Sequence, residues 1–250
     1  MDISNIKNNL ITYINLAITD DDNEFEARFL SRNNKITSEK FNNIISYLLN
    51  DKSDNGNKKY TLISNNLNNV SLDITLNNDI FLSQTLEKIK HYRLSINDDN
   101  EIKNYCKKNK YNKNNIMYGE KKRIDKYKPL DLLEHNIRFN VSLDRILNEK
   151  NNENLEEIKE NINKNIIKAD KKFRYKKRIT FLTDSKLFKI DLTLVKSGKS
   201  KFFYNSGILN SNPKYEIEIE LNHDEIKSQK IHKKKQSDLD KFIEDNLIKE

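Results

Sequence analysis

Hydrophobic and polar residues alternate over much of this chain, which is the two-residue period of a β-strand with one buried face. The clearest case is the run 70–76, in which Val70, Leu72, Ile74 and Leu76 alternate with polar residues. The same pattern predicts strands near 23–30, 90–96, 101–106, 116–124, 136–144, 172–183, 186–196 and 214–222. Many antiparallel strands joined by short turns are typical of a β-barrel or a β-sandwich.

Other segments repeat their hydrophobic residues with helical spacing, and Thr37 or Ser38 is placed to cap the second of them. The predicted helices cover 3–17, 38–49, 146–168 and 224–249, and a surface loop is predicted over 51–59. We therefore expect one domain over 1–222, followed by a C-terminal helix or connector over 223–250.

The charged residues of the predicted strands distinguish a barrel from a sandwich. Arg174, Lys176 and Arg178 share one strand face, and Asp191 and Thr193 share a face of the next strand. Each such strand has one charged side and one apolar side, and in a sandwich the charged sides would be solvated surface. Several of them together favour a mainly β fold with flanking helices, in which a closed barrel has a polar, charged lumen and an apolar outside.

Composition indicates the cellular compartment of the protein and the charge of the partner that it binds. The 250 residues carry a formal net charge of +8, which favours a polyanionic partner. The single cysteine, Cys106, excludes an intrachain disulfide and a cysteine zinc site. The sequence has no run of about 18 apolar residues and no secretory leader pattern at Met1. We expect a protein of the reducing cytoplasm.

Two acidic stretches far apart in the chain carry the strongest chemical signal. Glu24 and Glu26 alternate with apolar residues, and so do Glu216, Glu218 and Glu220. Facing each other inside a closed structure, these carboxylates would repel unless a divalent cation lay between them. Oxygen ligands suit Mg²⁺ or Mn²⁺ rather than zinc. The plainer reading is that both stretches are solvated strand faces.

A bound metal, cationic side chains and a free carboxylate together can hydrolyse a phosphoanhydride. The cations hold phosphate oxygens and the carboxylate orients a water molecule. Six segments in this order resemble the metal-dependent RNA 5′-triphosphatases of the triphosphate tunnel superfamily, most closely the N-terminal domain of giant-virus mRNA capping enzymes. The segments are 24–26, 121–124, 136–144, 173–178, 189–196 and 215–220.

The resemblance implies a tunnel of eight antiparallel strands that binds the triphosphate end of RNA and releases the γ-phosphate. It implies that Glu24, Glu26 and Glu220 ligate the metal, that Glu218 orients the attacking water, and that Glu216 supports the site through a basic neighbour. The implied phosphate-binding set is Arg93, Arg123, Arg138, Arg174, Lys176 and Arg178, buttressed by Asp191 and Thr193, with Lys176 and Arg178 also acting in catalysis.

Some residues depart from the family pattern or fall outside it. Asp144 stands where the family usually has Glu, and Lys196 has the opposite parity to Asp191. The strand 70–76 has no basic residue, so we expect it to lie outside the active surface. Lys121 is expected to support the site rather than bind substrate. The lysines at 233–235 are expected to be a solvated helix face.

The leading hypothesis is an RNA 5′-triphosphatase that performs the first step of mRNA capping with Mg²⁺ or Mn²⁺. No Lys-x-Asp-Gly nucleotidyl-transfer motif is present, so guanylyltransferase and methyltransferase domains or subunits are expected elsewhere. One alternative keeps the tunnel but hydrolyses tripolyphosphate or nucleoside triphosphates. Another is a non-catalytic subunit that binds RNA ends within a capping or transcription complex.

Overall fold

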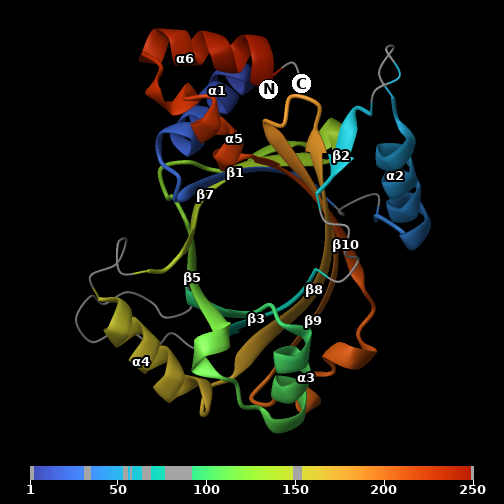
Figure 1. Ribbon diagram of the computed structural model, residues 1–250, viewed down its shortest axis with the longest axis vertical. Coiled ribbons are helices and arrows are strands. Elements are labelled where there is room, and N and C mark those ends of the chain that lie inside the picture. Colours follow the sequence, from blue (N-terminus) through green and yellow to red (C-terminus); the bar gives the residue numbers. More distant parts are fainter. Residues whose placement is uncertain are drawn as a thin grey trace.

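Eight antiparallel strands close into a ring in the computed structural model (Figure 1). It describes residues 3–30, 35–52, 56, 58–63, 69–76, 92–148 and 154–248. In ring order the strands are β1 (Asn23–Phe29), β10 (Lys214–Leu221), β9 (Phe188–Ser200), β8 (Lys171–Thr183), β3 (Val70–Leu76), β4 (Tyr92–Ile96), β5 (Ile116–Arg123) and β7 (Ile137–Ile146). Pairing of β7 with β1 completes the ring, which confirms the expected closed eight-stranded antiparallel barrel.

Two short strands lie beside the ring: β2 (Tyr60–Leu62) pairs with β8, and β6 (Leu130–Leu132) pairs with β7. The first and last strands of the chain are neighbours, with Glu26 directly opposite Glu220. On its other edge β1 pairs with β7, where Glu24 lies opposite Ser142. Strand β1 therefore closes the barrel by pairing with β7, and its pairing with β10 brings the first and last strands of the chain together.

Helices cover the outside of the ring (Figure 1). The longer helices are α1 (Ile3–Thr19), α2 (Ser38–Asn50), α3 (Asp99–Lys108), α4 (Leu155–Ile166), α5 (His223–Ser228) and α6 (Gln236–Phe242). The short ones are η2 (Lys113–Asn115), η3 (Leu133–His135), η4 (Phe203–Ser206), η5 (Ile208–Asn210), η6 (Ile231–Lys233) and the π-helical η7 (Ile243–Leu247). The helix predicted from 37–38 begins as expected, because the Thr37 hydroxyl accepts from the Lys40 amide.

The hydrophobic core lies between the helices and the outer face of the barrel. The outward residues Leu72, Ile74, Phe173 and Leu192 are each 0% exposed. One cluster packs α3 and α4 against β3 to β5, a second packs α1 and the C-terminal helices against β1, and a third packs α2 against β8 to β10. With the apolar faces turned outward, the alternate residues of every ring strand face the lumen.

The strand predicted over 101–106 is wrong, because this segment lies within helix α3. Asp98 caps the helix by accepting from the Glu101 amide, and Lys107 and Lys108 occupy its last turn. Ile102 and Tyr105 are three residues apart and both buried, which is helical spacing. Capping and charge placement outweighed the short apolar alternation.

The predicted helices at 146–168 and 224–249 have different bounds. Strand β7 continues to Ile146, and α4 begins only at Leu155. The C-terminal stretch is not one helix, because Lys230 adopts a left-handed φ of 56° between α5 and η6. Of the loop predicted over 51–59, the structure describes a bridge between Lys52 and Lys58, and the remainder lies partly outside the described residues.

Candidate metal and phosphate site

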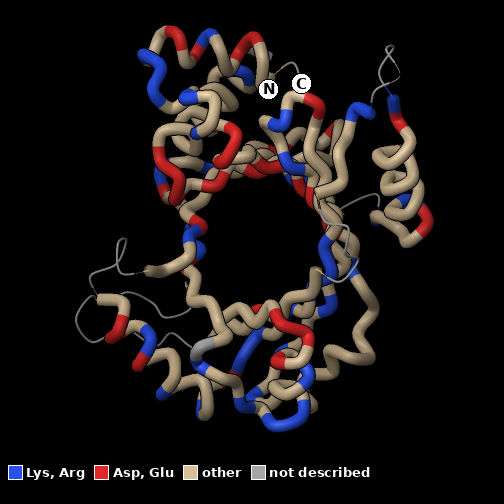
Figure 2. Tube along the Cα trace, in the orientation of Figure 1, with Lys and Arg blue, Asp and Glu red and all other residues tan. Residues whose placement is uncertain are grey.

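A polar cavity of about 720 Å³ occupies the barrel interior. Figure 2 shows acidic residues concentrated along the arc that carries β1, with basic residues along other parts of the ring. Of the site residues predicted from sequence, those lining the cavity are Glu24, Glu26, Arg93, Arg123, Arg138, Arg174, Lys176, Arg178, Glu216, Glu218 and Glu220. The remaining two, Asp191 and Thr193, are buried and contact Arg178.

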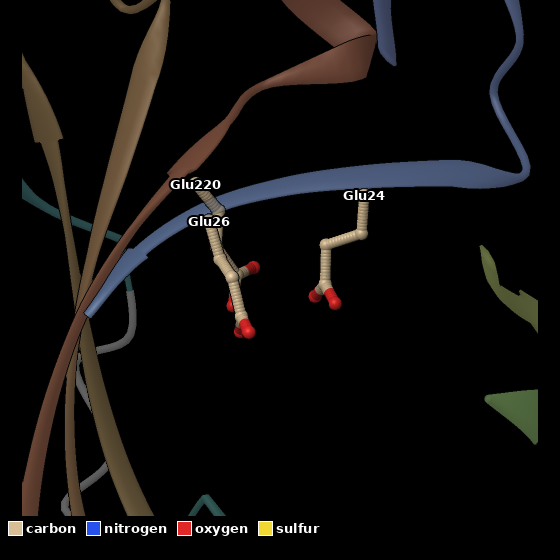
Figure 3. A group of neighbouring side chains, drawn as sticks. All are labelled: Glu24, Glu26 and Glu220. Atoms are coloured by element: carbon tan, nitrogen blue, oxygen red, sulfur yellow. The ribbon is translucent and has the colours of Figure 1, made fainter. Parts of the chain in front are cut away.

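Three carboxylates from the two chain-terminal strands converge at one point in this cavity. Glu24, Glu26 and Glu220 each offer an oxygen, and these oxygens lie within 4.8 Å of one another. All three side chains point to the same side of their strands (Figure 3). The alternation of β1 and the pairing of Glu26 with Glu220 produce this arrangement. An all-carboxylate donor set fits a hard divalent cation.

Burial and mutual repulsion dominate the electrostatics of this group. Burial raises the pKa of Glu220 well above its ordinary value, and the charges of Glu24 and Asp191 raise it further. Burial also raises the pKa of Glu24, against the opposing effect of Lys121. Lys121 forms an ion pair with Glu24 and another with Asp144 at 2.9 Å. A bound cation would remove the repulsion that these shifts reflect.

Glu218 lies beside this group but in a different environment. Its carboxylate pairs with Arg28, and its other oxygen is 3.6 Å from Arg178. Burial alone would raise the pKa of Glu218, but Arg28 and Arg178 outweigh it and hold the pKa below its ordinary value. Glu218 is therefore an ionised acceptor at neutral pH.

Strand β8 presents a row of cations, each held by a carboxylate. Arg174 donates to Glu216 at 2.8 Å, Lys176 pairs with Asp73 at 2.6 Å, and Arg178 pairs with Asp191 at 2.5 Å. Arg178 also donates to the Thr193 hydroxyl at 3.1 Å. Glu216 therefore contacts a basic neighbour, Arg174.

Asp73 corrects the expectation that the strand 70–76 lies outside the active surface. The residue lines the cavity from β3 and accepts from Ser95 at 2.8 Å as well as pairing with Lys176. Burial would raise the pKa of Asp73, but Lys176 and Arg93 hold it below its ordinary value. The inward position of Asp73 could have been predicted from the sequence, because Asp73 alternates with Leu72 and Ile74 and therefore lies on the opposite face of the strand.

Arg28 also lines the cavity, although no role was predicted for it from the sequence. It extends from β1, contacts Glu26 at 3.0 Å and also pairs with Glu218. On β7 the residue opposite Arg28 is Arg138, whose guanidinium donates two hydrogen bonds to Asp131 of β6, at 2.6 and 2.8 Å. Two arginines thus lie side by side, each held by carboxylates.

The remaining predicted residues have distinct positions. Arg93 donates to Asp144 at 2.7 Å, so Asp144 joins Arg93 to Lys121. Arg123 is exposed at the end of β5. Lys196 points away from the lumen, as its parity predicted, and donates to the Leu209 carbonyl.

The Ser197-Gly-Lys-Ser200 sequence lies within strand β9, so it does not form a phosphate-binding loop before a helix. The glycine there permits close packing, since a Cβ on Gly198 would lie 2.3 Å from the Ser206 carbonyl oxygen. Among the described residues, no helix is long and apolar enough to cross a membrane.

The closed barrel with a charged lumen is a tunnel fold, and solved RNA triphosphatases share it. The RNA triphosphatase domain of the trifunctional mimivirus mRNA capping enzyme matches with a TM-score of 0.59 and 20% identity, over 91% of this chain and 92% of that chain. A monoclinic form of the mimivirus capping enzyme triphosphatase gives 0.56 and 20%, over 90% and 94%. The S. pombe Pct1 RNA triphosphatase gives 0.52 and 13%, over 98% and 90%.

These likenesses establish the fold. No protein-family model matches the chain, and a search of curated proteins finds no match. The chemistry must therefore be argued from the residues of the lumen.

Proposed function

We propose that this protein hydrolyses the γ-phosphate of 5′-triphosphate RNA, giving 5′-diphosphate RNA in the first step of mRNA capping. The observation that carries the proposal is the convergence of Glu24, Glu26 and Glu220, within 4.8 Å, beside the row of cations on β8. A cation site next to several phosphate-binding side chains is the arrangement that phosphoryl transfer to water requires. The shared fold with two RNA triphosphatases agrees with it.

Glu24, Glu26 and Glu220 would hold Mg²⁺ or Mn²⁺, because all three offer carboxylate oxygens. Such an ion supplies charge neutralisation to the phosphate oxygens. We assign the remaining work to the protein's own side chains. Glu218 accepts a hydrogen bond from the attacking water, since Arg28 and Arg178 keep its carboxylate ionised.

The cations of the lumen bind the triphosphate and stabilise the charge that develops on it. Arg174, Lys176 and Arg178 follow one another on β8 at alternate positions, which matches a chain of phosphates better than a single anion. Their carboxylate partners fix the side chains before substrate arrives, so little reorganisation is needed on binding. Arg93, Arg123 and Arg138 extend the same surface, with Asp191 and Thr193 positioning Arg178.

We place catalysis in residues 1–222 and assign 223–250 a supporting or connecting role. The described C-terminal helices share a core with α1 and bury Ile226, Leu239 and Ile243 against it. The guanylyl-transfer and methylation steps of capping are assigned to other domains or subunits. For a viral protein, the cytoplasmic viral factory or the virion is the expected location.

The test is release of phosphate from γ-labelled triphosphate RNA in the presence of Mg²⁺ or Mn²⁺ and in the presence of a chelator. We expect release only with the divalent ion, and none from Glu26→Ala. Glu225→Gln is a matched control, because Glu225 is a partly exposed carboxylate on α5 outside the lumen. Release that persists in chelator or in the Glu26 variant would refute the metal mechanism.

The second candidate substrates are inorganic tripolyphosphate and nucleoside triphosphates, because the lining residues of the cavity recognise phosphate rather than a base. Comparison of kcat/KM across the three substrates separates these activities. Binding of triphosphate RNA with equal affinity in metal and in chelator, without hydrolysis of any of them, would instead indicate a non-catalytic RNA-end-binding subunit.

A further inference from the structure

Three exposed lysines continue the inward strand faces to one end of the barrel. Lys172 alternates with Arg174 on β8, Lys214 alternates with Glu216 on β10, and Lys199 has the inward parity of β9. Strands β8 and β10 begin at this end and β9 finishes there, so the three residues surround the same opening. We call Lys172, Lys199 and Lys214 the mouth lysines and this end of the barrel the basic mouth.

The mouth lysines repel one another, and the charge of Glu216 opposes this repulsion at Lys172 only in part. Lys172 lies directly opposite Lys199 in the β8–β9 register, and like charges in that position destabilise a sheet. Burial lowers the pKa of Lys172, and the charges of Arg174, Lys199 and Lys214 lower it further. Among the residues that the structure describes, none of the mouth lysines forms an ion pair with a carboxylate. This differs from the lumen, where the cations of β8 each have a carboxylate partner.

The opposite end of the barrel carries acids. Asp22 precedes β1, Asp98 follows β4, Asp184 follows β8 and Asp224 follows β10, and the antiparallel register brings these strand ends to the same opening. The Asp224 side chain is 91% exposed. We call this end the acidic mouth. At the acidic mouth Arg145 pairs with Asp22 at 2.8 Å and Lys189 lies 3.9 Å from Asp224, whereas the cations of the basic mouth form no such pair among the described residues, so a polyanion is attracted more strongly to the basic mouth.

The order of charges along the strands gives the tunnel a direction. Glu24 is near the start of β1 and Glu220 near the end of β10, so the metal group lies toward the acidic mouth. From there the lumen passes Arg178, Lys176 and Arg174 before it reaches the mouth lysines. Glu220 lies six positions after Lys214 on β10, about 20 Å along the strand at roughly 3.3 Å per residue. A triphosphate is shorter than this path.

We propose that the RNA chain leaves the tunnel through the basic mouth, with its first internucleotide phosphates held by Lys172, Lys199 and Lys214. This inference rests on the proposed function and adds the direction in which the substrate lies. The γ-phosphate reaches the glutamates, the α-phosphate lies toward Arg174, and the nucleotides follow outward. Flexible ammonium groups at an open rim suit a single strand of any sequence, because they read charge and not bases.

The test compares two substrates in the variant K172A/K199A/K214A. The variant and the wild type hydrolyse a 5′-triphosphate oligoribonucleotide and inorganic tripolyphosphate, which has no nucleotide to reach the mouth. We expect the ratio of kcat/KM for RNA to kcat/KM for tripolyphosphate to fall about tenfold or more, mainly through KM for RNA. The slope of log KM for RNA against log salt should fall by about 2, since three single-strand phosphate contacts are lost.

The matched control is K233A/K234A/K235A, which removes the same charge from exposed lysines outside the barrel. Its RNA-to-tripolyphosphate ratio should equal that of the wild type. Affinity for single-stranded RNA is measured in parallel by fluorescence anisotropy in chelator, and it should weaken only in the mouth variant. This measurement does not depend on turnover.

Equal losses on both substrates, an unchanged ratio, or the same loss in the control would each overturn the inference. A wild type that hydrolyses neither substrate would refute the proposed function instead. In that event the anisotropy measurement still decides whether the mouth lysines bind RNA. Circular dichroism and thermal unfolding of the variant establish that any loss comes from binding rather than from unfolding.

Discussion

The acidic strands β1 and β10 and the basic strand β8 face the same lumen, but their charges are balanced in different ways. On β8, Arg174, Lys176 and Arg178 each have a carboxylate partner within 2.8 Å. On the acidic side, Glu24 and Glu220 have raised pKa values because burial and neighbouring carboxylates oppose their ionisation. Among the described residues, Glu220 forms no ion pair.

We call β8 the basic wall of the lumen, and β1 and β10 its acidic wall. The two walls differ in whether their charges are already balanced before a ligand binds. On the basic wall Arg174, Lys176 and Arg178 are already paired with carboxylates, so we expect them to orient phosphates without large rearrangement. The acidic wall holds three carboxylates close together although Lys121 pairs with Glu24 and Arg28 with Glu26, and we propose that a cation completes it. A metal ion should therefore change the stability of the acidic wall, whereas substitutions in the basic wall should change substrate use.

The largest effect is expected from the acidic wall. Glu220→Gln keeps the shape of the side chain but removes one of the three converging charges, and we expect the metal-dependent rate of phosphate release to fall on the order of 10³-fold. The measurement is single-turnover release from γ-labelled RNA over a range of Mn²⁺ concentrations. Glu225→Gln, on α5 outside the lumen, should retain the full rate. Equal rates in the two variants would contradict the role of the acidic wall.

The second-largest effect is expected from substitution of Lys176, compared with substitution of its neighbour Lys177. The two residues are adjacent on β8, but Lys176 lines the cavity and Lys177 is exposed outside it. Lys176→Ala should lower kcat about 10²-fold, because a phosphate-binding charge is lost. Lys177→Ala should have the activity of the wild type. If both variants behave alike, the inward parity of β8 does not determine phosphate binding.

Asp73 tests whether the carboxylates of the basic wall are needed for its stability. Asp73→Asn leaves the buried Lys176 without its ionised partner, and we expect unfolding in denaturant at pH 7 to require about 2 kcal/mol less free energy. Because the folded-state pKa of Asp73 is lowered, its contribution is fully present above about pH 4 and disappears as the pH falls through the folded pKa. A difference between variant and wild type that grows on acidification would have the wrong sign.

The smallest effect is the response of the folded protein to metal alone. Mg²⁺ or Mn²⁺ at ten times its dissociation constant should stabilise the wild type by about 1.4 kcal/mol, a rise of a few degrees in Tm. In Glu220→Gln this rise should shrink, since the charge cluster is smaller. Na⁺ at matched ionic strength is the control for screening. A metal-induced rise of equal size in the variant would place the ion elsewhere.

Much of this molecule could be predicted from local patterns. The parity of charges along β8, β9 and β10 indicated a charged lumen, and the two glutamate stretches indicated residues that the fold brings together. Both inferences use the two-residue period of a strand, which is fixed by backbone geometry. The strand prediction at 101–106 failed because Asp98 and the terminal lysines of α3 favour a helix over a short alternation.

The partners of the site residues could not be predicted in the same way. Three of these partners form ion pairs between different strands. The pairs are Asp73 with Lys176, Asp131 with Arg138, and Arg28 with Glu218. Which strands are neighbours is decided by the closure of the ring, not by any one segment. A lone aspartate in 70–76 therefore looked unrelated to the site until its neighbour was known.

Ring closure also determines when during folding the ion site can exist. Glu26 lies opposite Glu220, so two of the three carboxylates come from the first strand of the chain and the third from the last. Because closing so long a loop costs more chain entropy, we expect this contact to form after the shorter-range strand pairs. A nascent polypeptide that lacks its final strand cannot assemble the three-carboxylate group, so the proposed hydrolysis requires that synthesis has passed β10.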